Sequence, residues 1–295
     1  MTDLATALAE SADAINGMLD RLLPLASGPE RRLAEAMRHG VLGGGKRIRP
    51  FLVMQSAALC GAPREQGLRV AAAVECLHCY SLIHDDLPAM DDAALRRGQP
   101  AVHRQYGEAM AILAGDALQA LAFEILANRA THPDARVRLG LVAQLAHAAG
   151  VGGMVTGQVL DIAAPERSAS LADVIRLQRL KTGALIEFAC LAGAVLTDAP
   201  AASRHALGAY AQDIGLAFQI ADDLLDVEGS EAETGKSVGQ DAAQRKATFI
   251  SIMGPAKART EAEALARRAA GHLDLFGDRA MLLKALAGYV VSRQA

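Results

Sequence analysis

The sequence contains no tryptophan, and phenylalanine and tyrosine make up only 3% of its 295 residues. Strands favour aromatic and β-branched side chains, whereas alanine and leucine, which dominate this chain, favour helices. The scarcity of aromatic residues therefore argues against a sheet protein and predicts an all-α chain. The length allows one large domain or two small ones.

Cysteine is also scarce. A chain with this much apolar sequence needs no disulfide framework, so a reducing cytoplasm is its expected location. Cys76 and Cys79 form a CxxC pair, but a zinc site needs a second pair, and Cys60 and Cys190 are not spaced to supply it. We interpret Cys76 and Cys79 as small apolar core residues.

A charge imbalance and a long apolar run are missing as well. The formal net charge of −3 leaves no polybasic surface for nucleic acid or an anionic membrane. The N-terminal segment carries acids where a secretory signal carries bases. We find no run of about 18 apolar residues free of charge, so we expect neither a membrane span nor a nucleic-acid partner.

Helical periodicity is present almost throughout the chain. Glycine and proline interrupt it at intervals that leave segments of roughly 15–30 residues, which suit long helices joined by short loops. We find no internal repeat, no linker and no strand-and-hairpin pattern. The sequence predicts a single all-α domain over residues 1–295, in which several helices are apolar on most sides and therefore central.

Asp85, Asp86 and Asp91 form a DDxxxxD motif within an apolar helical stretch. Carboxylates in apolar surroundings repel one another and lose hydration, and Mg²⁺ removes both problems. On a straight helix, residues six apart point about 240° apart. Because Pro88 cannot continue the hydrogen-bond ladder, we expect the helix to end or bulge near Leu87–Pro88 and bring Asp91 back toward Asp85.

A second acidic motif contains Asp222 and Asp226, which share a helix face because they are four residues apart. Asp223 points about 100° away from Asp222. Each motif alone has the alternative interpretation of a solvated helix face, and an EF-hand is excluded because neither segment has its loop. Together the two motifs predict facing walls of one metal cluster.

Basic residues surround both acidic motifs. Gly43–Gly45 precedes Lys46 and Arg49, and glycines let the backbone approach an anion closely. The segment is not a Walker loop, which would read GxxxxGK[ST]. Each base alone could be an ordinary solvated side chain, but their placement favours diphosphate binding. The further bases are Arg96, Arg97, Lys181, Lys236 and Lys246.

These segments together resemble the trans-prenyltransferase family, and within it the bacterial farnesyl diphosphate synthases. The resemblance covers nearly the whole chain in the family's order: GGGKRIRP, LHCYSLIHDDLPAMDD, LRRGQPAVH, GDALQALAFEIL, GGMVTGQVLDI, KTGALIE, FQIADDLLDV and TGKSVGQDAAQRKATF. It implies an isoprenoid synthase bundle with a central active-site cavity, a homodimer, and three Mg²⁺ ions per active site with substrate bound.

The resemblance also implies a role for each matching residue. Contacts to isopentenyl diphosphate fall to Lys46, Arg49, His78 and Arg97. Contacts to the allylic diphosphate fall to Arg96, Lys181, Thr182, Gln219 and Lys236. Asp85, Asp91 and Asp222 become the principal Mg²⁺ ligands, with Asp86 and Asp226 assisting directly or through water. The catalytic set is then Asp85, Asp86, Asp91, Arg96, Lys181 and Asp222.

The implied reaction is the head-to-tail condensation of isopentenyl diphosphate with dimethylallyl or geranyl diphosphate. Tyr80 and Ser81 lie just before Asp85 and can reach the tunnel under the allylic site. A bulky residue at Tyr80 acts as a floor, which in the family goes with the C15 product (2E,6E)-farnesyl diphosphate. C20 geranylgeranyl diphosphate is the alternative product. Tyr80 could also be an ordinary core residue with no part in setting product length.

Two other functions remain as alternatives. A class I terpene cyclase would carry an NSE/DTE-type second motif and a more aromatic pocket. A non-catalytic helical partner subunit could lose its aspartates without penalty, whereas both motifs are whole here.

Two positions depart from the family pattern. Ala93-Ala94 stands where bacterial members often carry further acids, and we expect the absence of these acids to have only a mild effect. Arg245-Lys246 replaces a common Gly-Lys and leaves the role of Lys246 open. We interpret His84 and His103 either as structural residues or as supports for the residues that contact substrate.

Overall fold

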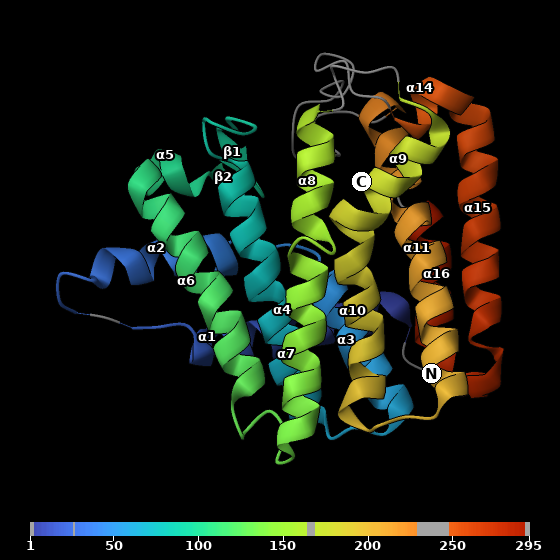
Figure 1. The fold of residues 1–295 in the computed structure, drawn as a ribbon, viewed down its shortest axis with the longest axis horizontal. Helices are drawn as coiled ribbons and strands as arrows, with labels where there is room; N and C mark the ends of the chain where they lie inside the picture. The colour runs from blue at the N-terminus through green and yellow to red at the C-terminus, as the bar shows by residue number, and fades with distance from the viewer. Residues whose placement is uncertain (1–2, 26, 164–168, 229–247, 293–295) are drawn as a thin grey trace. The chain divides into compact units, whose positions relative to one another are not determined.

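The computed structural model describes residues 3–25, 27–163, 169–228 and 248–292. Within these ranges the chain is helical apart from one short hairpin, as Figure 1 shows. The predicted all-α fold class is therefore confirmed. Contacts divide the chain into two compact units, Met1–Met54 with Ala62–Val142 and Gln55–Gly61 with Ala143–Ala295. The single domain over residues 1–295 stays a prediction.

The first unit is built around helix α4, which is buried on nearly all sides. Its middle run, Val70–Cys76, is fully or almost fully enclosed, as expected of a helix that is apolar all round. The elements of this unit are α1 (Leu4–Leu22), α2 (Arg31–Leu42), the start of α3 (Ile48–Cys60), α4 (Arg64–Asp85), β1 (Leu95–Arg96), β2 (Gln99–Pro100), α5 (Val102–Tyr106), α6 (Glu108–Ala127) and the first half of α7 (Ala135–Ala149).

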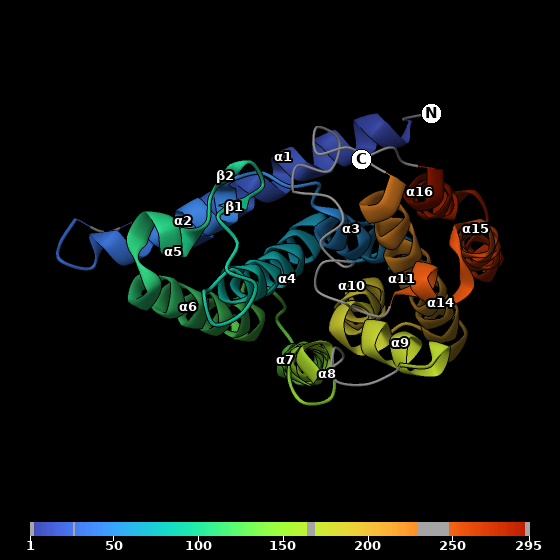
Figure 2. The same cartoon turned by 90° about the horizontal axis from the view of Figure 1, so that it is seen from above.

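Helix α6 packs along α4, and the two run side by side in Figures 1 and 2. The close approach depends on Gly115, because a methyl group there would lie 2.1 Å from the His84 ring. That ring's Nε2 lies 3.1 Å from the Ile112 carbonyl oxygen. His84 therefore joins two helices, which agrees with the structural role expected for it.

The hairpin is a feature that the sequence did not reveal. Arg97 and Gly98 have φ values of 55° and 75°, as the two central residues of a type I′ turn require. The turn pairs Arg96 with Gln99 in antiparallel register. Each strand is only two residues long, so no alternating pattern could develop and the expectation of no hairpin was wrong.

The second unit contains the second acidic motif, Asp222 and Asp226, together with Lys181. Ser56 joins its first segment to α10: its hydroxyl donates to the Ala189 carbonyl and accepts from the Gly193 amide, both at 3.2 Å. The elements are the ends of α3 and α7, α8 (Met154–Ala163), α9 (Leu171–Gln178), the π-helix η2 (Arg179–Gly183), α10 (Ala184–Leu196), α11 (Ala201–Glu228), α14 (Phe249–Met253), α15 (Pro255–His272), the 3₁₀ helix η3 (Asp274–Ala280) and α16 (Met281–Ser292).

Within this unit helices α11 and α15 pack closely together, and their ribbons run side by side in Figures 1 and 2. The Asp213 carboxylate of α11 accepts from Arg268 Nε at 2.7 Å and from Arg268 Nη2 at 2.6 Å. His272 Nε2 lies 3.0 Å from the same carboxylate. An ion pair thus fixes the long helix that carries the second acidic motif.

Two helical stretches of the described residues, 108–127 and 135–163, are long and apolar enough to cross a membrane by length and composition. Core helices of water-soluble proteins pass the same test, because a helix enclosed by other helices is also apolar on most sides. The first stretch carries Asp116 and Glu124 within it. The absence of a membrane span stays a prediction.

Candidate active site

The first acidic motif straddles the end of α4. The helix ends at Asp85, and the amide of Asp91 donates to the Asp85 carbonyl oxygen at 2.8 Å. The amides of Met90 and Asp92 both donate to the Leu87 carbonyl oxygen. These bonds form a tight turn around Pro88, so the expected helix break and the return of Asp91 toward Asp85 are confirmed.

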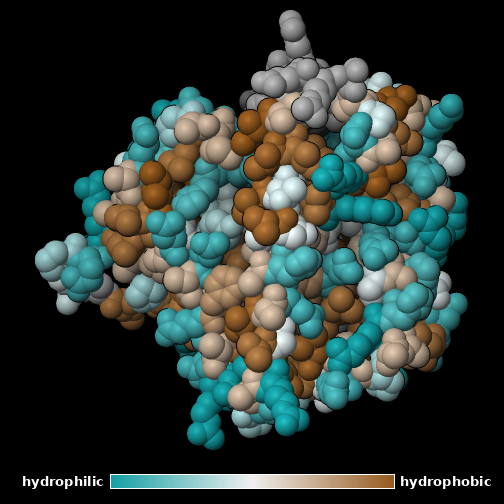
Figure 3. All heavy atoms as spheres, viewed as in Figure 1, coloured by the Kyte–Doolittle hydropathy of each residue, from teal (hydrophilic) through white to brown (hydrophobic). Residues whose placement is uncertain are grey.

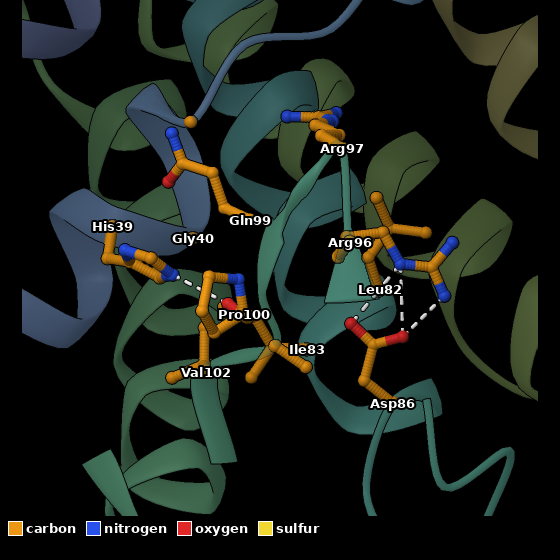
Figure 4. A pocket seen from close by; sticks show the side chains of 12 residues that line it. His39, Gly40, Leu82, Ile83, Asp86, Arg96, Arg97, Gln99, Pro100 and Val102 are labelled. Carbon is orange, nitrogen blue, oxygen red and sulfur yellow. Dashed lines mark hydrogen bonds and ion pairs between the residues drawn. The ribbon is translucent and has the colours of Figure 1, made fainter. Parts of the chain in front are cut away.

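Asp86 is held by the hairpin. Its carboxylate, only 2% exposed, accepts from Arg96 Nε at 3.0 and 3.2 Å and also from Arg96 Nη2. Figure 4 shows the two side chains facing each other, with His39 on the other side of the hairpin bonded to the Pro100 carbonyl. The Asp86 carboxylate is thus already occupied by a cation, which favours an indirect part in metal binding.

Tyr80 lies on α4 just before the motif and is 7% exposed. Burial raises the pKa of its hydroxyl, and the negative charge of Asp85 adds to the increase. The ring packs edge-on against His84 with centroids 5.6 Å apart. Ser81 directs its hydroxyl to the His78 carbonyl oxygen at 2.8 Å. Tyr80 therefore forms a rigid, neutral wall next to the Asp85 carboxylate.

The second acidic motif lies near the end of α11. Asp222 and Asp226 share a helix face, as their spacing predicted. Asp223 points elsewhere: its Oδ2 accepts the Phe249 amide at 2.9 Å, which satisfies the first backbone donor of α14. Asp223 thus supports the start of α14, whereas Asp222 and Asp226 are the pair that shares one helix face. Because the two acidic motifs belong to different units, their facing arrangement stays a prediction.

The four residues expected at isopentenyl diphosphate all belong to the first unit. Arg49 Nη1 lies 3.4 Å from His78 Nε2. Burial lowers the pKa of His78 well below its usual range, and the nearby cations Arg49, Arg97, Arg96 and Arg47 lower it further. The imidazole is therefore neutral at pH 7 and accepts from Arg49. Lys46 is exposed beside them on the glycine-rich loop.

Lys181 and Thr182 lie in the π-helix η2, a wide turn of a kind that occurs often at functional sites. Lys181 Nζ donates to Asp161 Oδ2 at 2.6 Å. A methyl group on Gly157 would lie 2.2 Å from the Lys181 backbone nitrogen, so α8 packs directly on this turn. Gln219 lies on α11, three residues before Asp222. Lys236 and Lys246 lie outside the described residues.

Sequence analysis missed two carboxylates that bind basic residues, the buried Glu75 and the half-buried Asp161. Glu75 accepts from Arg47 and from Arg97 Nη2, and Asp161 accepts from Lys181. The sequence does contain a signal for Glu75. It is an acid in the middle of an apolar helical run, and a buried charge needs a partner.

The cysteines behave as core residues. Burial raises the pKa of Cys79 to about 12, with the Glu75 carboxylate adding to the increase, and burial also raises the pKa of Cys76 well above its usual range. Both are therefore neutral thiols at pH 7 and poor nucleophiles or metal ligands. All four cysteines are free.

Among the described residues, no group of three or more His, Cys, Asp and Glu side chains is gathered closely enough to hold a metal ion. The donors that the two acidic motifs offer are all carboxylate oxygens, the ligand type that Mg²⁺ requires. Mg²⁺ retains several waters and is usually completed by substrate phosphates. Paired carboxylates without a closed cage therefore fit this ion.

Comparison with known proteins identifies the family. The polyprenyl synthetase family profile matches residues 30–275. The chain belongs to the polyprenyl synthetase family. This confirms the resemblance seen in the sequence, and family members use divalent metal ions.

Relatives within the polyprenyl synthetase family match nearly the whole chain. A geranylgeranyl diphosphate synthase of Cyanophora paradoxa is 40% identical over 99% of this chain and 97% of its own length. A farnesyl diphosphate synthase of Escherichia coli strain K12 is 44% identical over 92% and 91%. A solved structure of an FPP/GFPP synthase from Zymomonas mobilis is 48% identical, with a TM-score of 0.89 and coverage of 98% and 99%.

Proposed function

We propose that this chain is a trans-prenyl diphosphate synthase that joins isopentenyl diphosphate head-to-tail to an allylic diphosphate. The observation that carries the proposal is the presence, within one unit, of the Asp85–Asp91 turn and a separate cationic group around Arg49, His78 and Arg97. The aspartate motif serves the allylic diphosphate through bound metal. The group around Arg49, His78 and Arg97 supplies a site for a second diphosphate, that of isopentenyl diphosphate. A terpene cyclase has a single diphosphate to bind and needs no such group.

The metal in this proposal is Mg²⁺, three ions per active site with substrate bound. Asp85, Asp91 and Asp222 would hold it, with Asp226 and, indirectly, Asp86 assisting. When bound, Mg²⁺ supplies Lewis-acid stabilisation of the negative charge that grows on the departing diphosphate. The oxygen-only donor set of both motifs supports this choice.

The side chains of this protein supply the remaining electrostatics. Lys181 and Arg96 place positive charge at the allylic diphosphate, with Thr182, Gln219 and Lys236 as further contacts, so that breaking the allylic C–O bond leaves a stabilised leaving group. Isopentenyl diphosphate is held by Lys46, Arg49, His78 and Arg97. Its double bond then attacks the allylic cation and forms the new C–C bond. The proton lost in the last step goes to the released diphosphate. The apolar helices exclude water from the cation.

Two of the proposed allylic-site bases are held on carboxylates: Arg96 on Asp86 and Lys181 on Asp161. These ion pairs keep each cationic side chain in a defined orientation before substrate arrives, which reduces the entropy lost on binding. A diphosphate carries more charge than one carboxylate and can take over such a cation.

The proposed product is C15 farnesyl diphosphate, with C20 as the alternative. The relatives carry names of both kinds, so the chain length rests on Tyr80. This side chain is buried and braced by His84, and so it can end the tunnel beneath Asp85. Replacing Tyr80 with Ala removes the ring, and we expect C20 and longer products by chromatography.

The matched control is Tyr106→Ala, which removes a half-buried ring of the same unit on α5. It should leave the product length unchanged. An unaltered C15 product from the Tyr80→Ala protein would contradict the role of Tyr80 as the floor.

We also propose a homodimer. Val155, Val159 and Ile162 recur at helical spacing along α8 and are 43%, 59% and 60% exposed. In Figure 3 apolar atoms gather where α8 lies in Figure 1. An exposed apolar stripe on one helix is self-complementary across a two-fold axis, so a second copy suits it. Light scattering on the purified chain tests this. The cytoplasm is the proposed location, because its reducing conditions suit four free thiols.

The deciding experiment is incubation of the full chain with Mg²⁺, isopentenyl diphosphate and either dimethylallyl or geranyl diphosphate. We expect elongated prenyl diphosphates, with one inorganic diphosphate released for each isopentenyl unit added. Cyclic hydrocarbon from a single allylic substrate would favour the cyclase. No turnover with any primer would favour the non-catalytic subunit and would refute the proposal.

A further inference from the structure

Glu75 lies in the middle of α4, and its carboxylate is 1% exposed. The Oε1 atom accepts from Arg47 Nη1, from Arg97 Nη2 at 3.2 Å and from the Cys79 thiol at 3.7 Å. A buried carboxylate without compensating cations would be strongly unfavourable. Here one carboxylate meets two guanidinium groups, so the cluster as a whole keeps a positive charge.

Arg47 faces the protein interior, unlike its neighbours Lys46 and Arg49. Its Nε donates to Asn16 Oδ1 at 3.0 Å, and its Nη2 donates to the Val41 carbonyl at 2.7 Å. The residue has a φ of 49°, a left-handed conformation that costs energy for any residue with a side chain. The inward hydrogen bonds, including that to Glu75, hold the backbone in this conformation.

Arg97 completes a closed ring of contacts. Its Nη1 donates to the Gly44 carbonyl at 2.6 Å and lies 3.9 Å from the Cys79 sulfur. Gly45 leaves the space for it, because a methyl group there would lie 2.7 Å from the guanidinium carbon. Glu75 therefore reaches the glycine-rich loop twice, through Arg47 and through Arg97.

Burial alone would lower the pKa of Arg97, but the Cys79 sulfur and the Glu75 carboxylate outweigh it, and the pKa rises. The guanidinium is thus fully charged and is held by hydrogen bonds to Glu75 and to the Gly44 carbonyl. These contacts use Nη1 and one N–H of Nη2, and a guanidinium has five N–H donors, so further donors are available to bind an anion. A guanidinium presents a planar pair of donors to phosphate oxygens.

We propose that Glu75 is a positioning residue for the isopentenyl diphosphate site. It orients Arg97 directly, and through Arg47 it fixes the loop that carries Lys46 and leads to Arg49. The inference rests on the proposed function, since it takes these three bases as the contacts to that substrate. Glu75 touches no substrate itself, and its effect is preorganisation of the diphosphate site.

The test is Glu75→Gln in the full-length chain, which keeps the shape of the side chain and removes its charge. We expect the KM for isopentenyl diphosphate to rise about tenfold or more, because misplacement of a binding group by about 1 Å can cost up to a hundredfold. The KM for geranyl diphosphate and kcat at saturation should change by less than about twofold. Titration calorimetry with isopentenyl diphosphate should show the same loss of affinity.

The matched control is Asp213→Asn. Asp213 is also a largely buried carboxylate bound by an arginine, but it lies in the other unit and joins α11 to α15. Its replacement should lower the unfolding temperature and leave both KM values unchanged. A Glu75→Gln protein that behaves like this control, or whose two KM values rise together, would overturn the inference.

Asn16→Ala covers the case in which Glu75→Gln does not fold. It removes one acceptor of Arg47 at a half-buried position and should raise the KM for isopentenyl diphosphate alone, by roughly two- to fivefold. An unchanged KM in the folded Asn16→Ala protein would then overturn the inference. An assay of the wild-type chain separates the two proposals. If it does not elongate any primer, the proposed function fails. If it does, but the KM of the variant for isopentenyl diphosphate is unchanged, only the role of Glu75 is refuted.

Discussion

Gly157→Ala is a small change whose effect can be worked out from the packing of α8 on the π-helix. The added methyl group would lie 2.2 Å from the Lys181 nitrogen and 2.4 Å from its Cα, whereas ordinary contact begins at 3.4 Å. Both obstructing atoms are backbone and cannot rotate away. The two helices must therefore separate by about 1 Å, and the cost of such overpacking is about 1–3 kcal/mol.

The same shift displaces a predicted catalytic side chain. Lys181 is tied to Asp161 on α8 by a 2.6 Å bond, so moving α8 also moves the lysine's partner. A displacement of about 1 Å at a catalytic group costs up to about a hundredfold in rate. For Gly157→Ala we expect a loss of unfolding temperature of several degrees, at about 2–4 °C per kcal/mol. We also expect a fall in kcat of about ten- to a hundredfold.

Gly208→Ala on α11 is the matched control. A methyl group there would meet only the end of the Leu191 side chain, at 4.0 Å. Because alanine favours a helix over glycine, this variant should gain about 0.4–1 kcal/mol and keep its kcat. Calorimetry and steady-state elongation assays measure both proteins. A Gly157→Ala protein as stable and active as wild type would refute the steric reasoning.

Two further predictions concern the second acidic motif and the base cluster. Asp223→Ala removes the acceptor of the first amide of α14 and should cost about 1–2 kcal/mol of stability. Its loss of kcat should be much smaller than that of Asp222→Ala, and equal losses would refute the division of roles. The folded-state pKa of His78 is depressed, so as pH falls below about 6.5 the unfolded chain takes up the proton first and stability declines. His78→Gln should lose less stability than wild type between pH 7 and 5 by thermal unfolding, and identical pH profiles would contradict this.

The parts of the site that the sequence predicted are those determined by local geometry. The break after Asp85 followed from the spacing to Asp91 and from Pro88, because helix periodicity and the missing proline N–H act over a few residues. The shared face of Asp222 and Asp226 followed in the same way.

The parts that the sequence did not reveal depend on partners far along the chain. Glu75 is paired with an arginine 28 positions before it and another 22 positions after it. Asp161 and Lys181 are 20 positions apart, and Asp223 and Phe249 are 26 apart. Periodicity places each of these residues on its own helix but does not say which other helix it meets. Only tertiary packing decides that a carboxylate binds a base rather than a metal.

The π-helix at Arg179–Gly183 also sets the rotational phase between two helices. A π turn takes up one residue more than an α turn, so α9 and α10 meet with a phase that a continuous α-helix would not give. Deleting one residue here would restore the α-helical path and rotate the buried face of α9, which includes Val174, by about 100° relative to α10. A change of chain length at Lys181 or Thr182 would therefore disturb the packing of α9 as well as the position of these two side chains.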